Sequence, residues 1–562
     1  MNKISQQVLK TIEILAYLVA LWSLLVLFLE PVISYYADFA KVENYTAWAN
    51  LLLLALAIIN RLLLKEGKGI NGATIFDMIM LVVGLVILVY NAKFVIFLLL
   101  IRQTYYFLQF ILFRFSEGKI YLWLSSNPPI TLLLSFLLVI FLGTILLMLP
   151  VSSTYNRVTP FVDALFTATS ATCVTGLTVV PTGSHFSLFG QIIILLLIQT
   201  GGLGIMTLST AFALLLGRSI NLKLKNVMTQ VMGGTTRINI FQLLKNIIIA
   251  TAIIEACGAI VLFTKFAQDF PIREAIYYSI FHSISAFCNA GFSPFESSMM
   301  MYSDSIIISL GMPLLIFLGG LGFTVILDLY RYFFKPQKVR KLSLHSKIVL
   351  TTTAILIIVG LIAFFILEYN NTMKGFSFKH RFLASLFQSV TPRTAGFNTI
   401  DNGLLNKGSV LMTLLLMFIG ASPGSTGGGI KTTTLAVLAL TIISMLKGRK
   451  DISVFKRRIP KDNFREASGL VFLAATVIFV IVMILMMVEP FSFEDIIFES
   501  ISAFGTVGLS RGITPSLSSL GKILITLLMY IGRVGPLTLI YAFAKRRNHS
   551  NINYAEESIA IG

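Results

Sequence analysis

The sequence predicts an all-α polytopic membrane protein: four tandem helix, pore-loop and helix repeats around a central pore, preceded by about four extra transmembrane helices. The first supporting observation is composition, since 56% of the 562 residues are hydrophobic and only 12% are charged, about half the charge of a soluble domain. The second is a series of apolar runs, such as residues 131–149, that match the roughly 20 residues needed to cross a bilayer. The third is a fourfold internal repeat.

The positive charge of the chain lies in short polar segments between the apolar runs. A formal net charge of +19 would by itself suit a nucleic acid partner. The basic residues instead alternate with pairs of apolar runs, which is the positive-inside pattern of cytoplasmic loops. We therefore expect both termini in the cytoplasm, no nucleic acid partner, and the lipid bilayer as the surroundings of this charge. The basic segments are residues 218–245, 331–347, 447–465 and 545–547.

The apolar runs predict twelve membrane spans. Four lie near residues 12–30, 47–64, 74–90 and 94–113, and eight lie near 129–150, 188–216, 243–264, 303–330, 347–368, 409–446, 466–489 and 519–543. The first run lacks a small-residue cleavage site, so we interpret it as a retained helix. The predicted domains are an N-terminal transmembrane extension (1–126) and four pore repeats (127–230, 231–340, 341–460 and 461–562).

The extension carries few charges within its spans. Asp77 lies in its third span, and Arg102 and Arg114 lie in or near its fourth. Two arginines are far fewer than a voltage-sensing helix uses. Packing or assembly is therefore the preferred role for the extension, and voltage sensing is the alternative.

A related segment recurs in each of the last four hairpins and ends in Gly, then Leu or Phe, then a small polar residue. The segments read "FTATSATCVTGLT" (166–178), "FHSISAFCNAGFS" (281–293), "FQSVTPRTAGFN" (387–398) and "FESISAFGTVGLS" (498–510). A phenylalanine precedes the glycine by ten residues in three copies and by nine in the third. The glycines are Gly176, Gly291, Gly396 and Gly508, separated by 115, 105 and 112 residues.

The physics of this repeated segment favours a cation site. Non-helical backbone at membrane depth is tolerated where it is buried or lines a watery cavity. The C-terminal end of a short helix carries partial negative charge, and a ring of backbone carbonyls can replace the hydration shell of an ion. The predicted selectivity filter comprises Val174, Thr175, Gly176, Asn289, Ala290, Gly291, Thr394, Ala395, Gly396, Thr506, Val507 and Gly508.

From about residue 127 onward the chain resembles the Trk/Ktr/HKT superfamily of potassium transporters, above all the bacterial Trk- and Ktr-type membrane subunits. The strings "CVTGLTV", "SAFCNAGFS", "TPRTAGFNT" and "SAFGTVGLS" carry the resemblance. It implies potassium uptake across the cytoplasmic membrane, a homodimer, and a cytosolic ring of nucleotide-binding regulatory subunits. Some relatives have Ser at the first filter glycine, which goes with sodium permeation, so Gly176 implies a preference for K+.

The sixth pore-region run contains "GASPGSTGGGIKTTT", whose glycines and proline cannot hold a regular helix. We expect a loop from Gly420 to Lys431 at bilayer depth, and the resemblance implies that it blocks the pore as a gate. Arg533 lies inside an apolar run, where a charge is a functional candidate. We hypothesise that Arg533 and Lys431 form an electrostatic barrier that keeps the loop closed; a packing break and a snorkelling arginine are the alternatives. The predicted gate comprises Gly420, Ser422, Gly424, Ser425, Thr426, Gly427, Gly428, Gly429, Lys431 and Arg533.

Other polar residues near the filters receive structural interpretations first. We expect Asp163 and Asp495 to cap the pore half-helices, with attraction of cations as the alternative. We expect Glu499 and Arg393 to brace the loops, Glu255 to be either a hydrogen-bonded structural acid or a functional one, and Cys173 and Cys288 to be packed free thiols. The histidines are dispersed, so we expect no metal site beyond potassium at the filter.

Two other classes of function compete with potassium uptake. A sodium-coupled or sodium-permeable cation transporter would share the same filter, so Na+ is the alternative ion. A secondary transporter of organic solutes would use the broken helix as its binding site, but four parallel repeats fit it poorly. We expect no enzyme and no cofactor, because the spans lack paired acids and nucleophile constellations and Ile430 interrupts the resemblance of "GGGIKT" to a nucleotide-binding loop.

Overall fold

The computed structural model describes residues 38–63, 72–89, 91–100, 102–103, 128–204, 240–334, 341–449 and 451–535, with single positions between 15 and 26 and at 538. The described chain is helical apart from turns, loops and one small hairpin of β1 (Ser453–Val454) and β2 (Arg457–Arg458). The all-α fold class is therefore confirmed. The basic tail and residues 205–239 lie outside the described residues.

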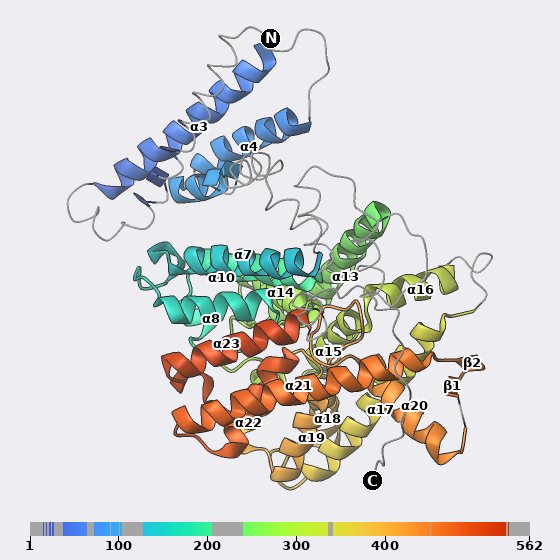
Figure 1. Ribbon diagram of the computed structural model, residues 1–562. Coiled ribbons are helices and arrows are strands. Elements are labelled where there is room, and N and C mark those ends of the chain that lie inside the picture. Colours follow the sequence, from blue (N-terminus) through green and yellow to red (C-terminus); the bar gives the residue numbers. More distant parts are fainter. Residues whose placement is uncertain are drawn as a thin grey trace.

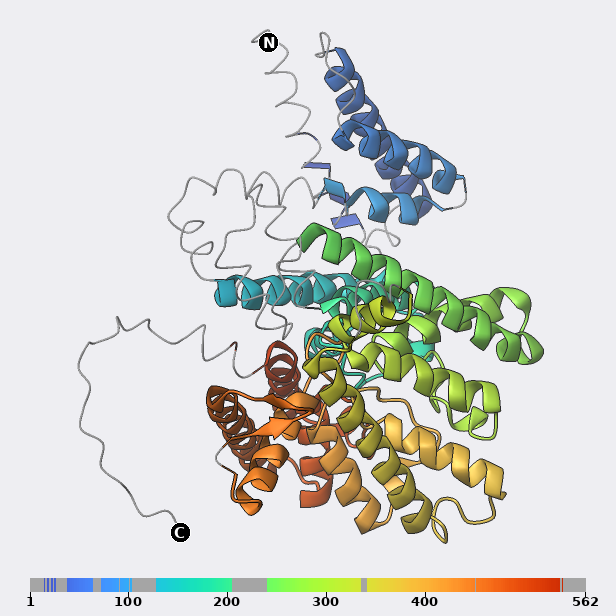
Figure 2. The ribbon, with the colours of Figure 1, turned by 90° about the vertical axis from the view of Figure 1, so that its right-hand side faces the viewer.

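Four helical repeats form the body of the molecule (Figures 1 and 2). Each has a long first helix, a pore half-helix and a second helix. The first helices are α7 (Pro128–Met148), α13 (Ile240–Asp269), α17 (Leu344–Leu367) and α21 (Lys461–Val488). The half-helices are α8 (Phe161–Thr172), α14 (Ile272–Phe287), α18 (Phe378–Val390) and α22 (Phe493–Gly505). The second helices are α10 (Leu188–Gly202), α15 (Ile306–Leu321) with α16 (Phe323–Phe334), α19 (Lys407–Phe418) with α20 (Thr432–Leu446), and α23 (Ser519–Val534). Short helical turns in the connections are η1 (Pro150–Ser152), α9 (Thr182–His185), η2 (Met300–Tyr302), η3 (Asn402–Leu404) and η4 (Thr514–Ser516).

Helices of the N-terminal part lie at one end of this body (Figures 1 and 2). They include α3 (Phe39–Leu63) and α4 (Gly72–Leu88). Phe97 packs edge-on against Phe189 of α10, with ring centroids 4.5 Å apart. Arg102 donates to both carboxylate oxygens of Asp77, at 2.7 and 2.6 Å, and both side chains are buried. A paired, buried arginine is suited to packing; Arg114 lies outside the described residues.

The first helices and the second helices differ in continuity. Among the described residues, five helices are long and apolar enough to cross a membrane, namely α3 and the first helix of every repeat. Together α15 and α16 would form a sixth span, but they meet at an angle of 100°. The expectation of one continuous helix over residues 303–330 is therefore wrong, because Gly322 between the two has φ +91°. Large apolar side chains such as Phe472 and Met487 stay exposed on α21, as suits a helix that faces lipid.

Contacts between repeats close the body into a ring. The second helix of each repeat packs on the half-helix of the next: α10 on α14, α15 on α18, α19 on α22, and α23 back on α8. The four phenylalanines that mark the sequence repeat are all fully buried: Phe166, Phe281, Phe387 and Phe498. The repeat therefore marks equivalent positions in one cyclic arrangement.

An ion pair joins the last repeat to the first. Lys522 Nζ of α23 lies 2.7 Å from Asp163 Oδ1 of α8, 359 residues away in sequence. The expectation that Asp163 caps α8 is wrong, because the N-cap residue is Pro160 and no side chain caps this helix. The carboxylate instead stabilises the junction between repeats.

We expect Asp163→Asn and Lys522→Met each to lower the thermal unfolding temperature of the purified protein, and the double variant to lower it little further. Residues in contact show coupling energies of about 1 kcal/mol in double-mutant cycles. A matched control is the pair Lys265 and Asp269, which lie within one helix turn on α13 and join no repeats. Additive losses for Asp163 and Lys522 would show that the pair contributes no coupling.

Candidate ion pathway

The four predicted filter segments follow directly on the C-terminal ends of the half-helices. Those helices end at Thr172, Phe287, Val390 and Gly505. The first two end two residues before their filter segment, the third ends four residues before it, and the fourth ends immediately before it. Helix C-termini carry about half a negative charge from their unsatisfied carbonyl groups. Four of them around one point make an electrostatic environment that favours a cation.

The filter segments touch one another in cyclic order. A Cβ atom built on Gly176 would lie 2.4 Å from the carbonyl oxygen of Ala290 in the next repeat. The corresponding distances are 2.8 Å from Gly291 to Ala395 O, 2.4 Å from Gly396 to Val507 O, and 2.2 Å from Gly508 to Thr175 O. Each glycine thus faces the carbonyl that precedes the next glycine around the ring. A side chain at any of the four positions would enter this ring of oxygens.

The backbone is strained at equivalent positions of all four segments. The glycines have φ between +72° and +92°, a region that glycine adopts readily. Two residues before each glycine, Val174, Asn289, Thr394 and Thr506 also have positive φ, between +50° and +71°. Three of these are β-branched, for which such a conformation is a genuine outlier. Strain of this kind persists at functional sites when surrounding contacts enforce it.

A hydrogen bond at the end of each half-helix enforces this conformation. The residue before each glycine donates its N–H to a carbonyl one turn back in the half-helix: Thr175 to Ser170 at 2.7 Å, Ala290 to Ser285 at 2.8 Å, Ala395 to Thr391 at 3.0 Å and Val507 to Ser502 at 2.9 Å. Thr391 therefore occupies in the third repeat the place that Ser170, Ser285 and Ser502 occupy in the other three. This equivalence explains why the third phenylalanine stands one residue nearer its glycine.

The second helices end or break close to equivalent glycines, a feature that was predicted in the third repeat alone. Helices α10, α15 and α23 end next to Gly204, Gly322 and Gly535, which have φ of +86°, +91° and +87°. Inside the same helices, Cβ atoms on Gly201, Gly319 and Gly532 would lie 1.9 Å from Thr172 O, Phe287 O and Phe504 O. Each glycine lets the second helix lie directly against the end of its own half-helix.

The predicted intramembrane loop separates α19 from α20 over residues 419–431. Its backbone bonds to the break between α15 and α16: Ser422 N to Gly320 O at 3.0 Å, Thr426 N to Gly319 O at 3.3 Å, and Phe323 N to Gly424 O at 2.9 Å. Within the loop, the Ser425 hydroxyl donates to Ser422 O at 2.6 Å. The loop is thus held by the neighbouring repeat.

The glycines of the loop lie against the filter. A Cβ on Gly427 would meet Thr394 Oγ1 at 2.1 Å, and one on Gly428 would meet Thr506 Oγ1 at 2.4 Å. Gly429 lies near Gly505, and Gly420 near Gly428 of the loop itself. Residues without side chains therefore allow the loop to fit beneath the filter segments, on the side of the half-helix ends.

Two cations, the buried Arg533 and the half-buried Lys431, hold consecutive carbonyls of the loop. Arg533 is 5% exposed and donates from Nη1 to Thr426 O and from Nη2 to Gly201 O. Lys431 Nζ donates to Gly427 O at 2.8 Å and lies 3.4 Å from Gly428 O. Of the predicted gate residues in the loop, Gly427 and Gly428 lie against the filter segments, whereas Ser422 and Gly424 lie toward α15 and the break that follows it. Arg533 ties the loop to the first repeat, and its buried position does not fit a snorkelling side chain.

The remaining polar residues brace the loops around the filter. Glu499 bonds to the Thr514 hydroxyl, and Arg393 Nη2 donates to Thr353 Oγ1 at 3.4 Å. Glu255 is hydrogen-bonded, since it accepts from Gln199 Nε2 at 3.3 Å. The cysteines Cys173 and Cys288 are buried and free, as predicted.

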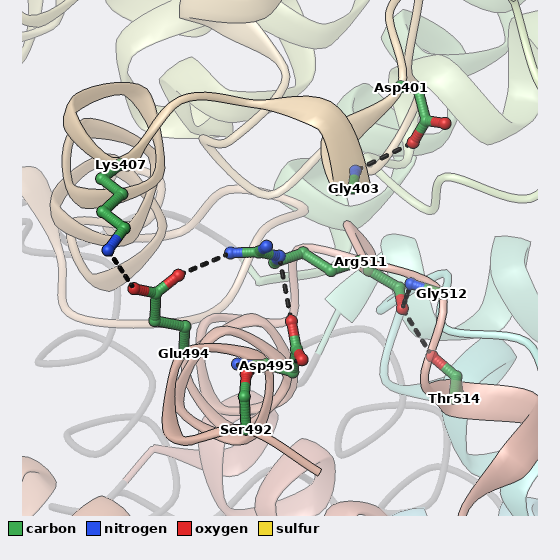
Figure 3. Close-up of polar contacts among 10 residues, drawn as sticks. Asp401, Gly403, Lys407, Ser492, Glu494, Asp495, Arg511, Gly512 and Thr514 are labelled. Carbon is green, nitrogen blue, oxygen red and sulfur yellow. Dashed lines mark hydrogen bonds and ion pairs between the residues drawn. The ribbon is translucent and has the colours of Figure 1, made fainter.

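Arg511, three residues after Gly508, was not singled out from the sequence. Its guanidinium lies 3.0 Å from Asp495 and 3.4 Å from Glu494, which in turn lies 3.9 Å from Lys407 of the third repeat (Figure 3). The N-cap residue of α22 is Ser492, which accepts from Asp495 N at 3.2 Å and donates to Asp495 Oδ2 at 2.6 Å. Asp495 therefore supports the cap without being the cap residue. The signal that could have identified Arg511 in the sequence is a charged residue three positions after a repeat glycine.

A closed ring of four half-helices, in which each following glycine lies against a carbonyl of the next repeat, inside a bundle of apolar helices, indicates a multi-pass membrane protein of the cation-transport class. Comparison with known proteins agrees. The TrkH family, described as a cation transport protein, matches residues 93–554. The chain therefore belongs to the TrkH family of cation transport proteins.

Relatives within this family are transporters. The chain is 40% identical over 449 residues to the Ktr system potassium uptake protein B of Bacillus subtilis, covering 80% of this chain and 99% of that protein. It is 39% identical to the protein of the same name from Vibrio alginolyticus, covering 78% and 96%. It is 38% identical to the potassium/sodium uptake protein NtpJ of Enterococcus hirae, covering 78% and 97%.

A solved structure resembles the whole fold. The potassium transporter TrkH from Vibrio parahaemolyticus matches with a TM-score of 0.59 and 19% identity, over 96% of this chain and 99% of that one. At this identity the likeness concerns the fold alone. It covers far more of the chain than the four pore repeats.

Proposed function

We propose that this chain takes up K+ across the cytoplasmic membrane through a selectivity filter made of the twelve predicted residues. One observation carries the proposal: the closed cycle in which each filter glycine faces the carbonyl oxygen of the next repeat. Carbonyl rings replace the hydration shell of an alkali ion. A potential of about 100 mV supplies roughly 2.3 kcal/mol per charge, which supports about fifty-fold accumulation. No covalent reaction and no cofactor are needed.

The loop over residues 420–431 acts in this proposal as the gate. It lies against the filter segments, and Arg533 and Lys431 hold three of its consecutive carbonyls. Their charges oppose the passage of a cation while the loop is in place. Movement of the loop would remove both the obstruction and the carbonyl contacts of the two cations.

Rubidium flux into liposomes that contain the purified chain tests the proposal. K+ should compete with rubidium, Na+ should compete weakly, and organic solutes should not compete. Equal competition by Na+ would favour the sodium-permeable alternative, for which the Enterococcus hirae relative, a potassium/sodium uptake protein, gives a precedent. Flux of an organic solute without rubidium flux would overturn the filter.

We further propose a homodimer with cytoplasmic termini that is regulated by a cytosolic ring of nucleotide-binding subunits. The relatives named as parts of a Ktr system support additional subunits. The β1–β2 hairpin exposes Arg457 and Arg458 within a segment expected in the cytoplasm. Complementation of a cell deficient in potassium uptake, by the chain alone and with candidate ring subunits, tests the partner, and light scattering of the purified protein tests the dimer.

A further inference from the structure

A single hydroxyl group connects the filter to the intramembrane loop. The Oγ1 atom of Thr506 accepts a hydrogen bond from the N–H of Gly428, with a nitrogen-to-oxygen distance of 3.0 Å. The two residues are 78 positions apart in sequence, and both are buried. We propose that Thr506 is a latch that positions the loop against the filter, and this inference rests on the proposed functions of those two segments.

The position of this hydroxyl is fixed from the filter side. Thr506 is left-handed, with φ +50° and ψ +53°, and its own N–H bonds to Ala503 O at 3.1 Å. A β-branched residue in this conformation is held by its surroundings. The Thr506 hydroxyl therefore occupies its place only while the filter segment keeps its shape, which couples the loop to the state of the filter.

The N–H of Gly428 is buried against Thr506. Contact is direct, since a Cβ on Gly428 would lie 2.4 Å from Oγ1 and 2.8 Å from Cγ2 of Thr506. A buried N–H without a partner is costly. Loss of the hydroxyl therefore raises the free energy of the closed loop, while an open loop can hydrate the same N–H.

Among the four equivalent filter positions, only the position in repeat four supplies a hydroxyl for this latch. The residue in repeat one is Val174, which has no hydroxyl. In repeats two and three, the Asn289 amide and the Thr394 hydroxyl lie 3.0 Å apart and pair with each other. Thr506 and Arg533 both belong to the fourth repeat, and they hold the loop at residues two positions apart, Gly428 and Thr426.

The test is Thr506→Val, which removes the hydroxyl at nearly constant volume, in the full chain reconstituted in liposomes. We expect the maximal rubidium flux to rise about fivefold, because one net hydrogen bond shifts a two-state equilibrium by roughly that factor. Thr506→Ser, which keeps the hydroxyl, should restore the original flux.

A matched control removes another buried hydroxyl of the same kind. Thr413 lies in α19, and its hydroxyl bonds only to the Ser409 carbonyl of its own helix. Thr413→Val should leave the flux unchanged. Lost selectivity without a rise in flux, or a Ser variant that behaves like Val, would overturn the latch and leave the filter proposal standing.

Amide hydrogen exchange gives a readout that does not depend on transport. Thr506→Val should speed exchange in the peptide that contains Gly428, and Thr506→Ser should not. Unchanged exchange in the Val variant would overturn the latch. Absence of rubidium flux in the original protein would instead count against the proposed function, and the exchange result would still decide on the latch.

Discussion

Gly508→Ala is expected to lower rubidium uptake at least tenfold. The added methyl group would lie 2.2 Å from the carbonyl oxygen of Thr175 and 2.9 Å from the Cα atom of Gly176. Both neighbours are backbone atoms, so neither can rotate away. Gly508 also has φ +90°, which costs an alanine about 1 kcal/mol or more. The ring of carbonyls must then deform, and flux of rubidium into liposomes measures the loss.

Gly512 offers a matched control in the same loop. Its φ is +99°, and a Cβ there would meet nothing within 4 Å. Gly512→Ala therefore imposes similar backbone strain without entering the ring of oxygens. We expect it to keep most of the uptake. Equal effects of the two substitutions would attribute the loss to strain in the loop and would count against a carbonyl filter.

Arg533→Ala should raise flux through the pore several-fold. Removal of the guanidinium leaves the carbonyls of Thr426 and Gly201 without their donor, at a cost of about 1–3 kcal/mol for each buried group left unpaired. It also removes a positive charge from the path of the cation. Both effects favour a displaced loop, and rubidium flux at a fixed potassium gradient measures the increase.

Two further variants separate the causes of this increase. Arg533→Lys keeps the charge but cannot reach two carbonyls with one planar group, so an intermediate flux is expected. Arg458→Ala removes an exposed arginine from the β1–β2 hairpin and should have no effect. Unchanged flux in Arg533→Ala would refute its role in holding the loop.

The four repeated segments could be predicted because their signal recurs four times along the chain. Four glycines in register identified the four segments, and the structure brings these segments into contact. The strain two residues earlier could not be predicted, because valine and threonine at Val174, Thr394 and Thr506 argue against a left-handed backbone. Tertiary contacts impose that conformation. The conformational preferences of single residues do not predict the left-handed backbone.

The breaks in the second helices were missed although a signal was present. The strings "TGGLG" (200–204), "LGGLG" (318–322) and "IGRVG" (531–535) lie at equivalent places and mark the three breaks. Only the richest such string, in the third repeat, was interpreted as a break. The other three were read as apolar helix because two or three glycines do not interrupt a hydropathy pattern.

Partners across long sequence separations were beyond prediction. Arg533 was recognised because a charge in an apolar run is costly, but its contact with Gly201 spans 332 residues. Asp163 was expected to cap its helix, which is the usual role of an acid in a first turn. Its pairing with Lys522 depends on how the fourth repeat meets the first, and the sequence carries no local sign of that junction.

The cyclic arrangement has a consequence for how the pore can evolve. Where four identical subunits build a channel, one codon change alters every quadrant at once. Here one gene encodes the four quadrants one after another, so each quadrant can mutate independently. One equivalent position already holds three different residue types, in Val174, Asn289, Thr394 and Thr506. Ion coordination and attachment of the intramembrane loop can thus be carried out by different repeats of the same ring.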